Sequence, residues 1–179
     1  MKSIATIGGG CFWCFEAIYQ DVLGVESVVS GYSGGNKPNP TDKEVYYNDT
    51  GHAEVVQVTF DPEILSYRDL IEIFYVMHDP TQLNRQGHDV GDEYRSVIFY
   101  HDQEQHTVAD DMTKNFAPTV WDDPIVTQIV PFENFWPAAD YHQNYYKQNT
   151  EAGYCQIIIN PKLQKFRQKY ADRLKTTSA

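Results

Sequence analysis

The residues best suited to chemistry in this chain are its cysteines, Cys11, Cys14 and Cys155. Cys11 directly follows three glycines, and a helical spacing of apolar residues begins at the same point. A thiol at the first turn of a helix faces unpaired N–H groups and the positive end of the helix dipole, which favour the thiolate. We therefore predict that Cys11 is a nucleophile and that its pKa is lowered.

Two large aromatic rings, Phe12 and Trp13, separate Cys11 from Cys14. Such rings suit a small, soft group such as a thioether or sulfoxide methyl, through hydrophobic and sulfur–aromatic contact. Three other interpretations stay open at this point. Cys11 and Cys14 could be core residues of a helix, a redox dithiol, or half of a zinc site completed by Cys155 and a histidine. The zinc interpretation is disfavoured because the sequence has no second paired motif.

The elements that must position these residues interleave strands with helices. Apolar patterns and turn formers predict strands over residues 3–7, 27–32, 53–60, 96–100 and 125–130. They predict helices over residues 11–23, 66–77, 102–116, 138–148 and 161–174. Residues 78–93 are expected to form a long functional loop, and Cys155 is expected in an irregular segment.

These elements predict an α+β fold, a two-layer sandwich in which helices cover a mixed β-sheet. We expect a ferredoxin-like core, a loop-rich C-terminal segment and a single domain over residues 1–179.

Composition narrows the class of partner. The chain has 179 residues, 41% of them hydrophobic, and a formal net charge of -11. An acidic surface repels phosphate backbones and anionic lipid, so neither nucleic acid nor a membrane is expected as a partner. No apolar run is long enough to span a bilayer, no signal peptide is evident, and the odd number of cysteines does not fit a secreted disulfide framework. We expect a cytoplasmic monomer.

An ordered set of motifs extends over the chain from about Ile4 to Cys155. Its members are Gly10-Cys11-Phe12-Trp13, Gly31-Tyr32-Ser33-Gly34-Gly35, Pro38-Asn39-Pro40-Thr41, Gly51-His52-Ala53-Glu54, residues 74–81, Gln86-Gly87-His88-Asp89, Tyr94-Arg95-Ser96, Asp140-Tyr141-His142-Gln143 and Gly153-Tyr154-Cys155. With these motifs in this order, the chain resembles the peptide methionine sulfoxide reductases of the A type.

The resemblance implies a thiol-dependent reduction of methionine S-sulfoxide, free or in peptides and proteins, as repair after oxidative stress. Cys11 would attack the sulfoxide sulfur and become a sulfenic acid. Cys155 would resolve that acid as a disulfide, and thioredoxin would reduce the disulfide. The family acts on the S epimer, and each epimer has its own enzyme type. No metal or other cofactor is implied.

Further roles follow from the same resemblance. Phe12 and Trp13 match the cage for the substrate's methyl group, while Asp89 and Tyr94 match residues that bind the sulfoxide oxygen. Glu54 matches the acid that protonates this oxygen. The chemistry needs such an acid because a sulfoxide oxygen is a poor leaving group, and Glu54 would serve if burial raised its pKa.

The chain also departs from the family. Asp42 stands where a tyrosine commonly follows Pro-Asn-Pro-Thr, and Ala139 stands where glutamate is frequent. An acidic Asp42 near the oxygen would oppose binding unless it points away. Cys14 occupies a common glycine position and is a further redox thiol, a relay toward Cys155 or a buried bystander.

Other functions remain as alternatives. The first is a general Cys-x-x-Cys dithiol oxidoreductase that uses Cys11 and Cys14. The others are a non-catalytic metal- or peptide-binding module and a cysteine hydrolase that pairs Cys11 with His52 or His142.

Overall fold

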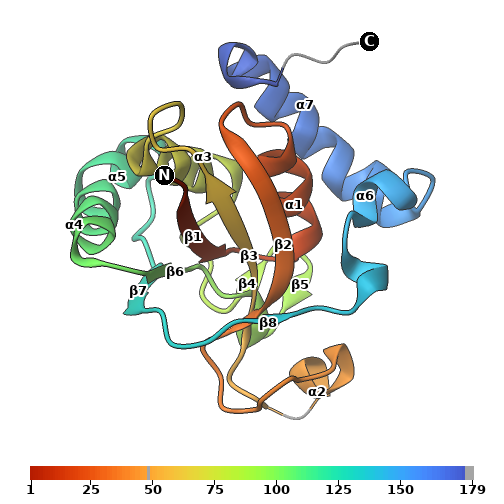
Figure 1. Cartoon of the computed structure of the whole chain (residues 1–179). Helices are drawn as coiled ribbons and strands as arrows, with labels where there is room; N and C mark the ends of the chain where they lie inside the picture. Colours follow the sequence, from red (N-terminus) through yellow and green to blue (C-terminus); the bar gives the residue numbers. More distant parts are fainter. Residues whose placement is uncertain (48, 176–179) are drawn as a thin grey trace.

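The computed structural model describes residues 1–47 and 49–175. Within these residues the main sheet has six strands in the order β7-β6-β1-β3-β2-β8 (Figure 1). The strands are β1 (Ser3–Gly8), β2 (Val25–Ser33), β3 (Ala53–Phe60), β6 (Val97–Tyr100), β7 (Gln128–Pro131) and β8 (Trp136–Pro137). A small separate hairpin joins β4 (Arg85–Gln86) to β5 (Asp89–Val90).

The helices follow the strands along the chain. They are α1 (Phe12–Gln20), α2 (Asp42–Tyr47), α3 (Tyr67–Met77), α4 (Gln103–Asp111), α5 (Ala117–Val120), α6 (Tyr145–Gln148) and α7 (Asn160–Lys169). A π-helical turn over Met112–Phe116 joins α4 to α5, and another over Cys155–Ile159 leads into α7. Short 3₁₀ turns occur at Asp92–Tyr94, Asp140–His142 and Ala171–Arg173.

The centre of the molecule has the split βαβ arrangement of ferredoxin-like folds. Helix α1 links β1 to β2, α3 links β3 to β6, and the strands lie in the order β6-β1-β3-β2 with every neighbouring pair antiparallel. Strand β7 then joins β6 in parallel, which makes the sheet mixed. The predicted α+β class, mixed sheet and ferredoxin-like core are confirmed.

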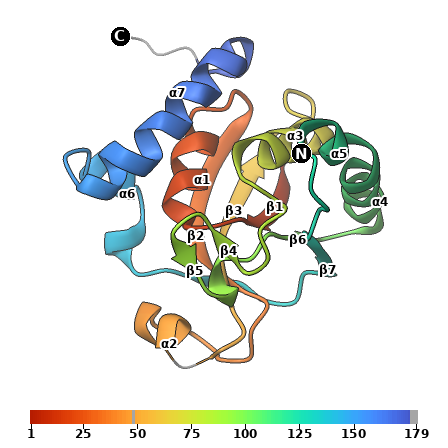
Figure 2. The same ribbon diagram turned by 180° about the vertical axis from the view of Figure 1, so that it is seen from behind.

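Helices cover one face of this sheet. Seen from behind, α1, α3 and α7 lie in front of the strands (Figure 2). The main core forms between them, and from β3 it takes Val56, Val58 and Phe60. Ala53 and Val55 point to the opposite face and join a smaller cluster with Val97 and Phe99. Because side chains alternate along a strand, Glu54 lies on the helix-covered face.

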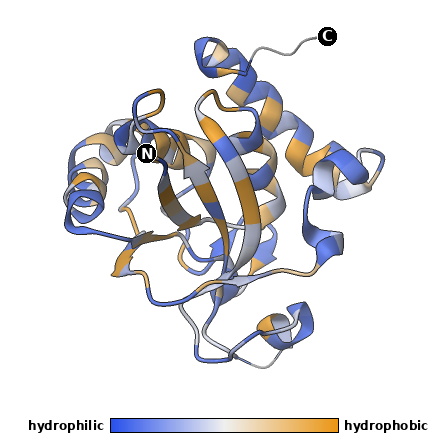
Figure 3. Ribbon diagram, in the orientation of Figure 1, coloured by the Kyte–Doolittle hydropathy of each residue, from blue (hydrophilic) through white to orange (hydrophobic). Residues whose placement is uncertain are grey.

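Hydrophobic residues concentrate on the central strands and on the helix faces turned toward them, whereas the β4–β5 hairpin is mainly hydrophilic (Figure 3). None of the helices in the described part of the chain has the length and apolar character of a membrane span.

Helix α1 begins where the three glycines end. Gly10 has φ +94°, and a Cβ on Gly9 would lie 2.6 Å from the His78 ring. Gly10 N–H donates to the Tyr94 carbonyl at 3.2 Å, which ties the turn to the segment before β6. The glycines therefore allow the close packing that fixes the first residue of the helix.

Most predicted elements of the first 120 residues are confirmed, and the strand over 53–60 coincides with β3. Helix α2 was not predicted, and residues 78–93 contain the hairpin and a 3₁₀ turn within the expected loop. The long helix predicted over residues 138–148 is wrong. Asn144, at φ 54°, separates the short turn at Asp140–His142 from α6, because its N–H and that of Tyr145 donate to the Glu16 carboxylate on α1.

The prediction for Cys155 is also wrong, since this residue begins a helical segment. The predicted last helix, over residues 161–174, ends earlier, because Tyr170 leaves the helical conformation.

Candidate active site

Cys11 occupies the N-cap position of α1, with extended backbone angles (φ -63°, ψ 130°). Its side chain is 9% exposed. Cys11 also borders a cavity of about 310 Å³, into which a small group can enter. The sequence prediction that Cys11 lies at the start of a helix is confirmed.

Glu54 lies at the same end of α1. The backbone N–H of Phe12 donates to Glu54 Oε1 at 3.1 Å, so the first free N–H of the helix binds the carboxyl group. Glu54 is 1% exposed. Burial raises the pKa of Glu54 from 4.5 to about 8, while hydrogen bonds from Phe12 and Tyr46 oppose the rise and the charges of Asp89 and Glu93 add to it. A glutamic acid with this pKa can carry a proton at neutral pH.

The prediction of a lowered pKa for Cys11 is wrong. Burial raises the pKa of the Cys11 thiol well above its ordinary value, and the negative charges of Glu54 and Cys14 raise it further. The backbone N–H of Trp13 acts in the opposite direction but is the weaker effect. Desolvation of the thiolate outweighs the helix dipole here. Since Glu54 and Cys11 disfavour each other's negative charge, the pair keeps at least one proton.

Trp13 is held on several sides by the segment that precedes Cys155. Its ring stacks on Tyr145 with a centroid distance of 3.6 Å and meets Tyr154 edge-on at 5.5 Å. Its indole N–H donates to His142 Nδ1 at 3.2 Å. The Phe12 ring lies 5.3 Å from the His142 ring, so both aromatic residues after Cys11 pack against this segment, although neither lines the cavity that Cys11 borders.

The Asp42 carboxylate is bound to the segment at Tyr141 and His142. Its Oδ2 lies 3.2 Å from His142 Nε2 and accepts a hydrogen bond from the Tyr141 hydroxyl. The Tyr141 hydrogen bond is the largest of the effects that lower the pKa of Asp42. Because an indole N–H can only donate, His142 Nδ1 is the acceptor and Nε2 carries the proton given to Asp42. Asp42 therefore orients His142, which orients Trp13.

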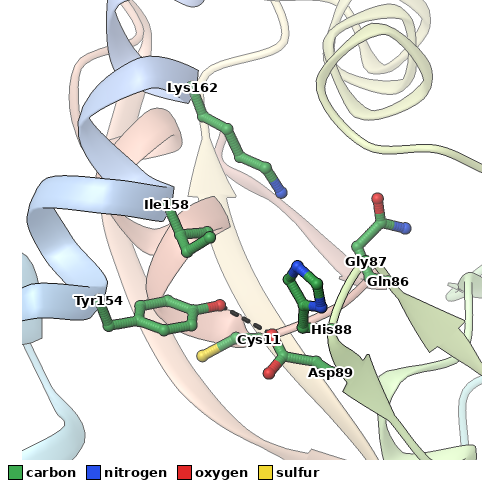
Figure 4. A pocket seen from close by; sticks show the side chains of 8 residues that line it. All are labelled: Cys11, Gln86, Gly87, His88, Asp89, Tyr154, Ile158 and Lys162. Atoms are coloured by element: carbon green, nitrogen blue, oxygen red, sulfur yellow. Dashed lines mark hydrogen bonds between the residues drawn. The ribbon is translucent and has the colours of Figure 1, made fainter.

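The cavity beside Cys11 lies between the β4–β5 hairpin and the last helical segment (Figure 4). Its lining consists of Cys11, Gln86, Gly87, His88, Asp89, Tyr154, Ile158 and Lys162. The Tyr154 hydroxyl donates to Asp89 Oδ2 at 2.9 Å and lies 3.9 Å from Cys14 Sγ. Asp89 thus lines the cavity together with Cys11, and it already has a hydrogen-bond partner; its binding of the sulfoxide oxygen stays a prediction.

Tyrosines surround the carboxyl group of Glu54. Tyr94 ends the 3₁₀ turn over Asp92–Tyr94, and burial together with the charges of Glu54 and Cys11 raises its pKa. Tyr46, on α2, is near enough to Glu54 to lower the pKa of its carboxyl group. Tyr32 lies opposite Glu54 in the β2–β3 pairing. The site therefore offers several hydroxyl groups next to the acid.

The remaining two cysteines differ in position. Cys14 lies one turn along α1 from Cys11, and its N–H donates to the Cys11 carbonyl at 3.2 Å. Cys155 has 0% exposure and does not line the cavity, although its neighbour Tyr154 does. All three thiols are free. In this state Cys155 is buried, and it directly follows Tyr154, which lines the cavity with Cys11.

Within residues 1–47 and 49–175, no three His, Cys, Asp or Glu side chains are grouped so that they could hold a metal ion. His52 is occupied structurally, since Nδ1 accepts from Gly35 N–H at 3.0 Å and Nε2 contacts the Lys37 carbonyl at 2.7 Å. The site is therefore built from thiols, carboxyl groups and aromatic rings.

Several residues of the site were missed from the sequence. They are Tyr32, Tyr46, Tyr145, Tyr154 and Lys162. Tyr154 and Tyr32 lie within the motifs quoted above, which was the available signal. Nothing in the local pattern indicated Lys162, because the last helix reaches the cavity only through tertiary packing.

The fold and the site together define a thiol-dependent enzyme of α+β architecture, in which a cysteine at a helix start adjoins a buried, protonatable acid. The family model described as peptide methionine sulfoxide reductase matches residues 3–174. The chain belongs to this family.

Individual relatives agree with this assignment. The peptide methionine sulfoxide reductase MsrA of Sulfolobus acidocaldarius is 51% identical over 170 residues, which cover 95% of this chain and 96% of the relative. The crystal structure of Mxr1 from Saccharomyces cerevisiae in reduced form matches with a TM-score of 0.80 and 33% identity, covering 86% of this chain and 89% of that one. A crystal structure of Mxr1 in complex with Trx2 matches with a TM-score of 0.57 and 27% identity, covering 80% of this chain and 84% of Mxr1.

Proposed function

We propose that the chain reduces methionine S-sulfoxide, free or within peptides and proteins, with Cys11 as the nucleophile. The observation that carries this proposal is the pairing of Cys11 with Glu54 at the start of α1, where the Phe12 N–H binds the carboxyl group at 3.1 Å. A thiol beside a buried acid of raised pKa is the arrangement that sulfoxide reduction needs.

The protons can be followed through the first step. Glu54 gives its proton to the sulfoxide oxygen as Cys11 Sγ attacks the sulfur, and the carboxylate then takes the thiol proton. The attack forms a bond between Cys11 Sγ and the substrate sulfur. This bond and the substrate's S–O bond then break as the hydroxyl group passes to Cys11 Sγ, and the products are methionine and a Cys11 sulfenic acid. Sulfur is reduced in the substrate and oxidised in Cys11, so the step balances without a cofactor.

The aromatic and the polar residues have separate tasks in this proposal. Phe12 and Trp13 hold the methyl group, since they directly follow Cys11 in the chain and their rings are fixed by His142 and Tyr145. Tyr94 and Asp89 bind the sulfoxide oxygen or the groups around it. For Asp89 this requires that its hydrogen bond from Tyr154 be shared or exchanged.

The cycle then needs a second thiol and a reductant. Cys155 attacks the sulfenic sulfur, releases water and forms a disulfide with Cys11, and thioredoxin reduces this disulfide. The complex of the relative Mxr1 with Trx2 supports a protein reductant of this kind. Because Cys155 is buried, we expect the segment at Cys155–Ile159 to unwind before the disulfide forms.

The test uses the sulfoxide without any reductant. One turnover of the wild-type protein should yield one methionine and one disulfide, located by mass spectrometry of the digested protein. A Cys11→Ser variant should yield no methionine, and the R epimer should not be reduced. Methionine formation by the Cys11→Ser variant at the wild-type rate would refute the proposal.

A second function is favoured by one observation. Cys14 is one helical turn from Cys11, a separation within the reach of a disulfide, and Cys155 has 0% exposure. A general dithiol oxidoreductase would therefore form a Cys11–Cys14 disulfide, reduce insulin and be insensitive to Cys155→Ser. The same disulfide mapping separates it from the first proposal.

We also propose that residues 1–179 form one domain that acts as a cytoplasmic monomer. One continuous core links β1, α1, α3 and α7, which supports the single domain. The odd number of cysteines does not fit a secreted disulfide framework, which supports a reducing compartment. Light scattering coupled to size-exclusion chromatography tests the monomer.

A further inference from the structure

The hydroxyl of Tyr32 is buried without a partner. Tyr32 is 1% exposed, and its hydroxyl has no hydrogen-bond partner among the described residues. Buried hydroxyl groups are normally paired, because an unpaired one loses its hydration without compensation. A hydroxyl of this kind is free to donate to a ligand, provided that its position brings a ligand within reach.

The position of Tyr32 identifies where that ligand lies. Tyr32 is directly opposite Glu54 in the antiparallel pairing of β2 with β3, so both side chains project from the same face at the distance of cross-strand neighbours. Its ring packs against Phe12 with a centroid distance of 5.6 Å. Burial raises the pKa of the Tyr32 hydroxyl, and the charges of Glu54, Asp42 and Cys11 raise it further.

The carboxyl groups of Glu54 and Asp42 each have other hydrogen-bond partners, and among the described residues neither accepts from Tyr32. Glu54 Oε1 accepts a hydrogen bond from the Phe12 N–H. The Asp42 carboxylate is bound by Tyr141 and His142. The Tyr32 hydroxyl is therefore left as an unused hydrogen-bond donor beside Glu54 and the Phe12 ring.

We propose that the Tyr32 hydroxyl donates a hydrogen bond to the sulfoxide oxygen as the S–O bond to the substrate breaks. The inference rests on the proposed reduction of methionine S-sulfoxide. Negative charge grows on this oxygen when Cys11 Sγ adds to the sulfur, and a fixed donor in a water-poor site stabilises that charge. Glu54 supplies the proton that is transferred, and Tyr32 keeps its own. Its hydroxyl stays neutral, because burial disfavours the phenolate.

A matched pair of variants tests this role. Tyr67 also has a buried hydroxyl without a partner among the described residues, but its ring packs on Phe60, at 6.5 Å, away from Cys11. Tyr32→Phe and Tyr67→Phe each remove one unpaired hydroxyl, so both should keep the wild-type Tm or raise it. Tyr32→Phe should lower the single-turnover rate of methionine formation by about 10²-fold, in the range for loss of one oxyanion donor. Its KM should change little, and Tyr67→Phe should keep the wild-type rate.

The outcomes separate the two proposals. A wild-type protein that reduces the sulfoxide, together with an equally fast Tyr32→Phe variant, would overturn this inference alone. A Tyr32→Phe variant that loses Tm along with activity would also overturn it, since its hydroxyl would then have a structural partner. A wild-type protein that fails to reduce the sulfoxide would overturn the proposed function and this inference with it.

Discussion

Replacing Glu54 by glutamine should stabilise the protein while it abolishes most of its activity. Glutamine keeps the shape of the side chain and can still accept the Phe12 N–H, which donates to Glu54 Oε1 at 3.1 Å. It cannot ionise and cannot give a proton to the sulfoxide oxygen. Loss of a general acid typically lowers the rate about 10²- to 10⁴-fold.

The gain in stability follows from the pKa of Glu54, which burial raises from 4.5 to about 8. Below about pH 4.5 Glu54 is protonated in both the folded and the unfolded chain, so its raised pKa does not lower the free energy of unfolding. Between pH 4.5 and about 8 the unfolded chain loses the proton while the folded chain keeps it, so stability falls as the pH rises. At about 1.4 kcal/mol for each pKa unit, the full effect is about 5 kcal/mol as an upper bound. The Glu54→Gln variant lacks this destabilisation, because glutamine does not titrate.

Urea unfolding of both proteins at pH 4.5, 6, 7 and 8.5 measures this effect, at pH values chosen around the range over which Glu54 titrates. The free energy of unfolding of Glu54→Gln minus that of the wild type should grow steadily across the series. Single-turnover methionine formation, measured in parallel, should fall in the wild type above pH 8 and stay low in the variant at every pH. Parallel stability curves for the two proteins would refute the raised pKa, and a variant with wild-type rate would refute the role of Glu54 as the acid.

Other substitutions test the supports of the site. Asp42→Ala removes the acceptor that orients His142 and, through it, Trp13. The KM for the sulfoxide should rise about fivefold, as expected for the loss of one hydrogen bond of about 1 kcal/mol. An unchanged KM would contradict this role of Asp42. Gly9→Ala places a Cβ 2.6 Å from the His78 ring. Urea unfolding should show that the free energy of unfolding falls by about 1–3 kcal/mol. The control Gly153→Ala should show no such fall, because nothing lies within 4 Å of the added Cβ. A folded Gly9→Ala protein of wild-type stability would contradict the packing argument.

The elements of the ferredoxin-like core were predictable because local signals and tertiary structure agree there. The three glycines mark the start of α1, and β3 alternates apolar residues until Asp61-Pro62. Ser66 caps α3 by accepting the Asp69 N–H at 3.0 Å, as its position before an apolar helix predicted. Such signals act over a few residues and can be read from sequence.

Helix α2 was overlooked although a local signal exists. Thr41 and Glu44 form a capping box, in which Glu44 N–H donates to Thr41 Oγ1 at 3.2 Å and Thr41 N–H donates to Glu44 Oε1 at 3.0 Å. The helix covers only Asp42–Tyr47 and contains one fully buried side chain, Val45, so it has no apolar periodicity. The break at Asn144 had no local signal, because Glu16 on α1 binds its N–H from 128 residues away.

The pKa of Cys11 was predicted in the wrong direction because a sequence motif reports helix position but not burial. The dipole and the Trp13 N–H do favour the thiolate, yet the side chain is 9% exposed and adjoins Glu54 and Cys14. Whether a cysteine at a helix start is activated therefore depends on which carboxyl groups the sheet places next to it. Here that group is Glu54 on β3, 42 residues further along the chain, and a local motif cannot report it.

The raised pKa values of Cys11 and Glu54 have a common physical origin, and together they suit a sulfoxide better than a disulfide as the target. An attack on a disulfide needs a thiolate and no proton, which would favour a low pKa at Cys11. An attack on a sulfoxide needs a nucleophile and a proton at adjacent positions at the same moment, because the oxygen must leave as a protonated group. A buried pair that cannot become doubly negative retains that proton next to the sulfur. The desolvation that makes Cys11 a poor general reductant thus keeps the acid protonated, and this favours sulfoxide reduction over dithiol exchange with Cys14.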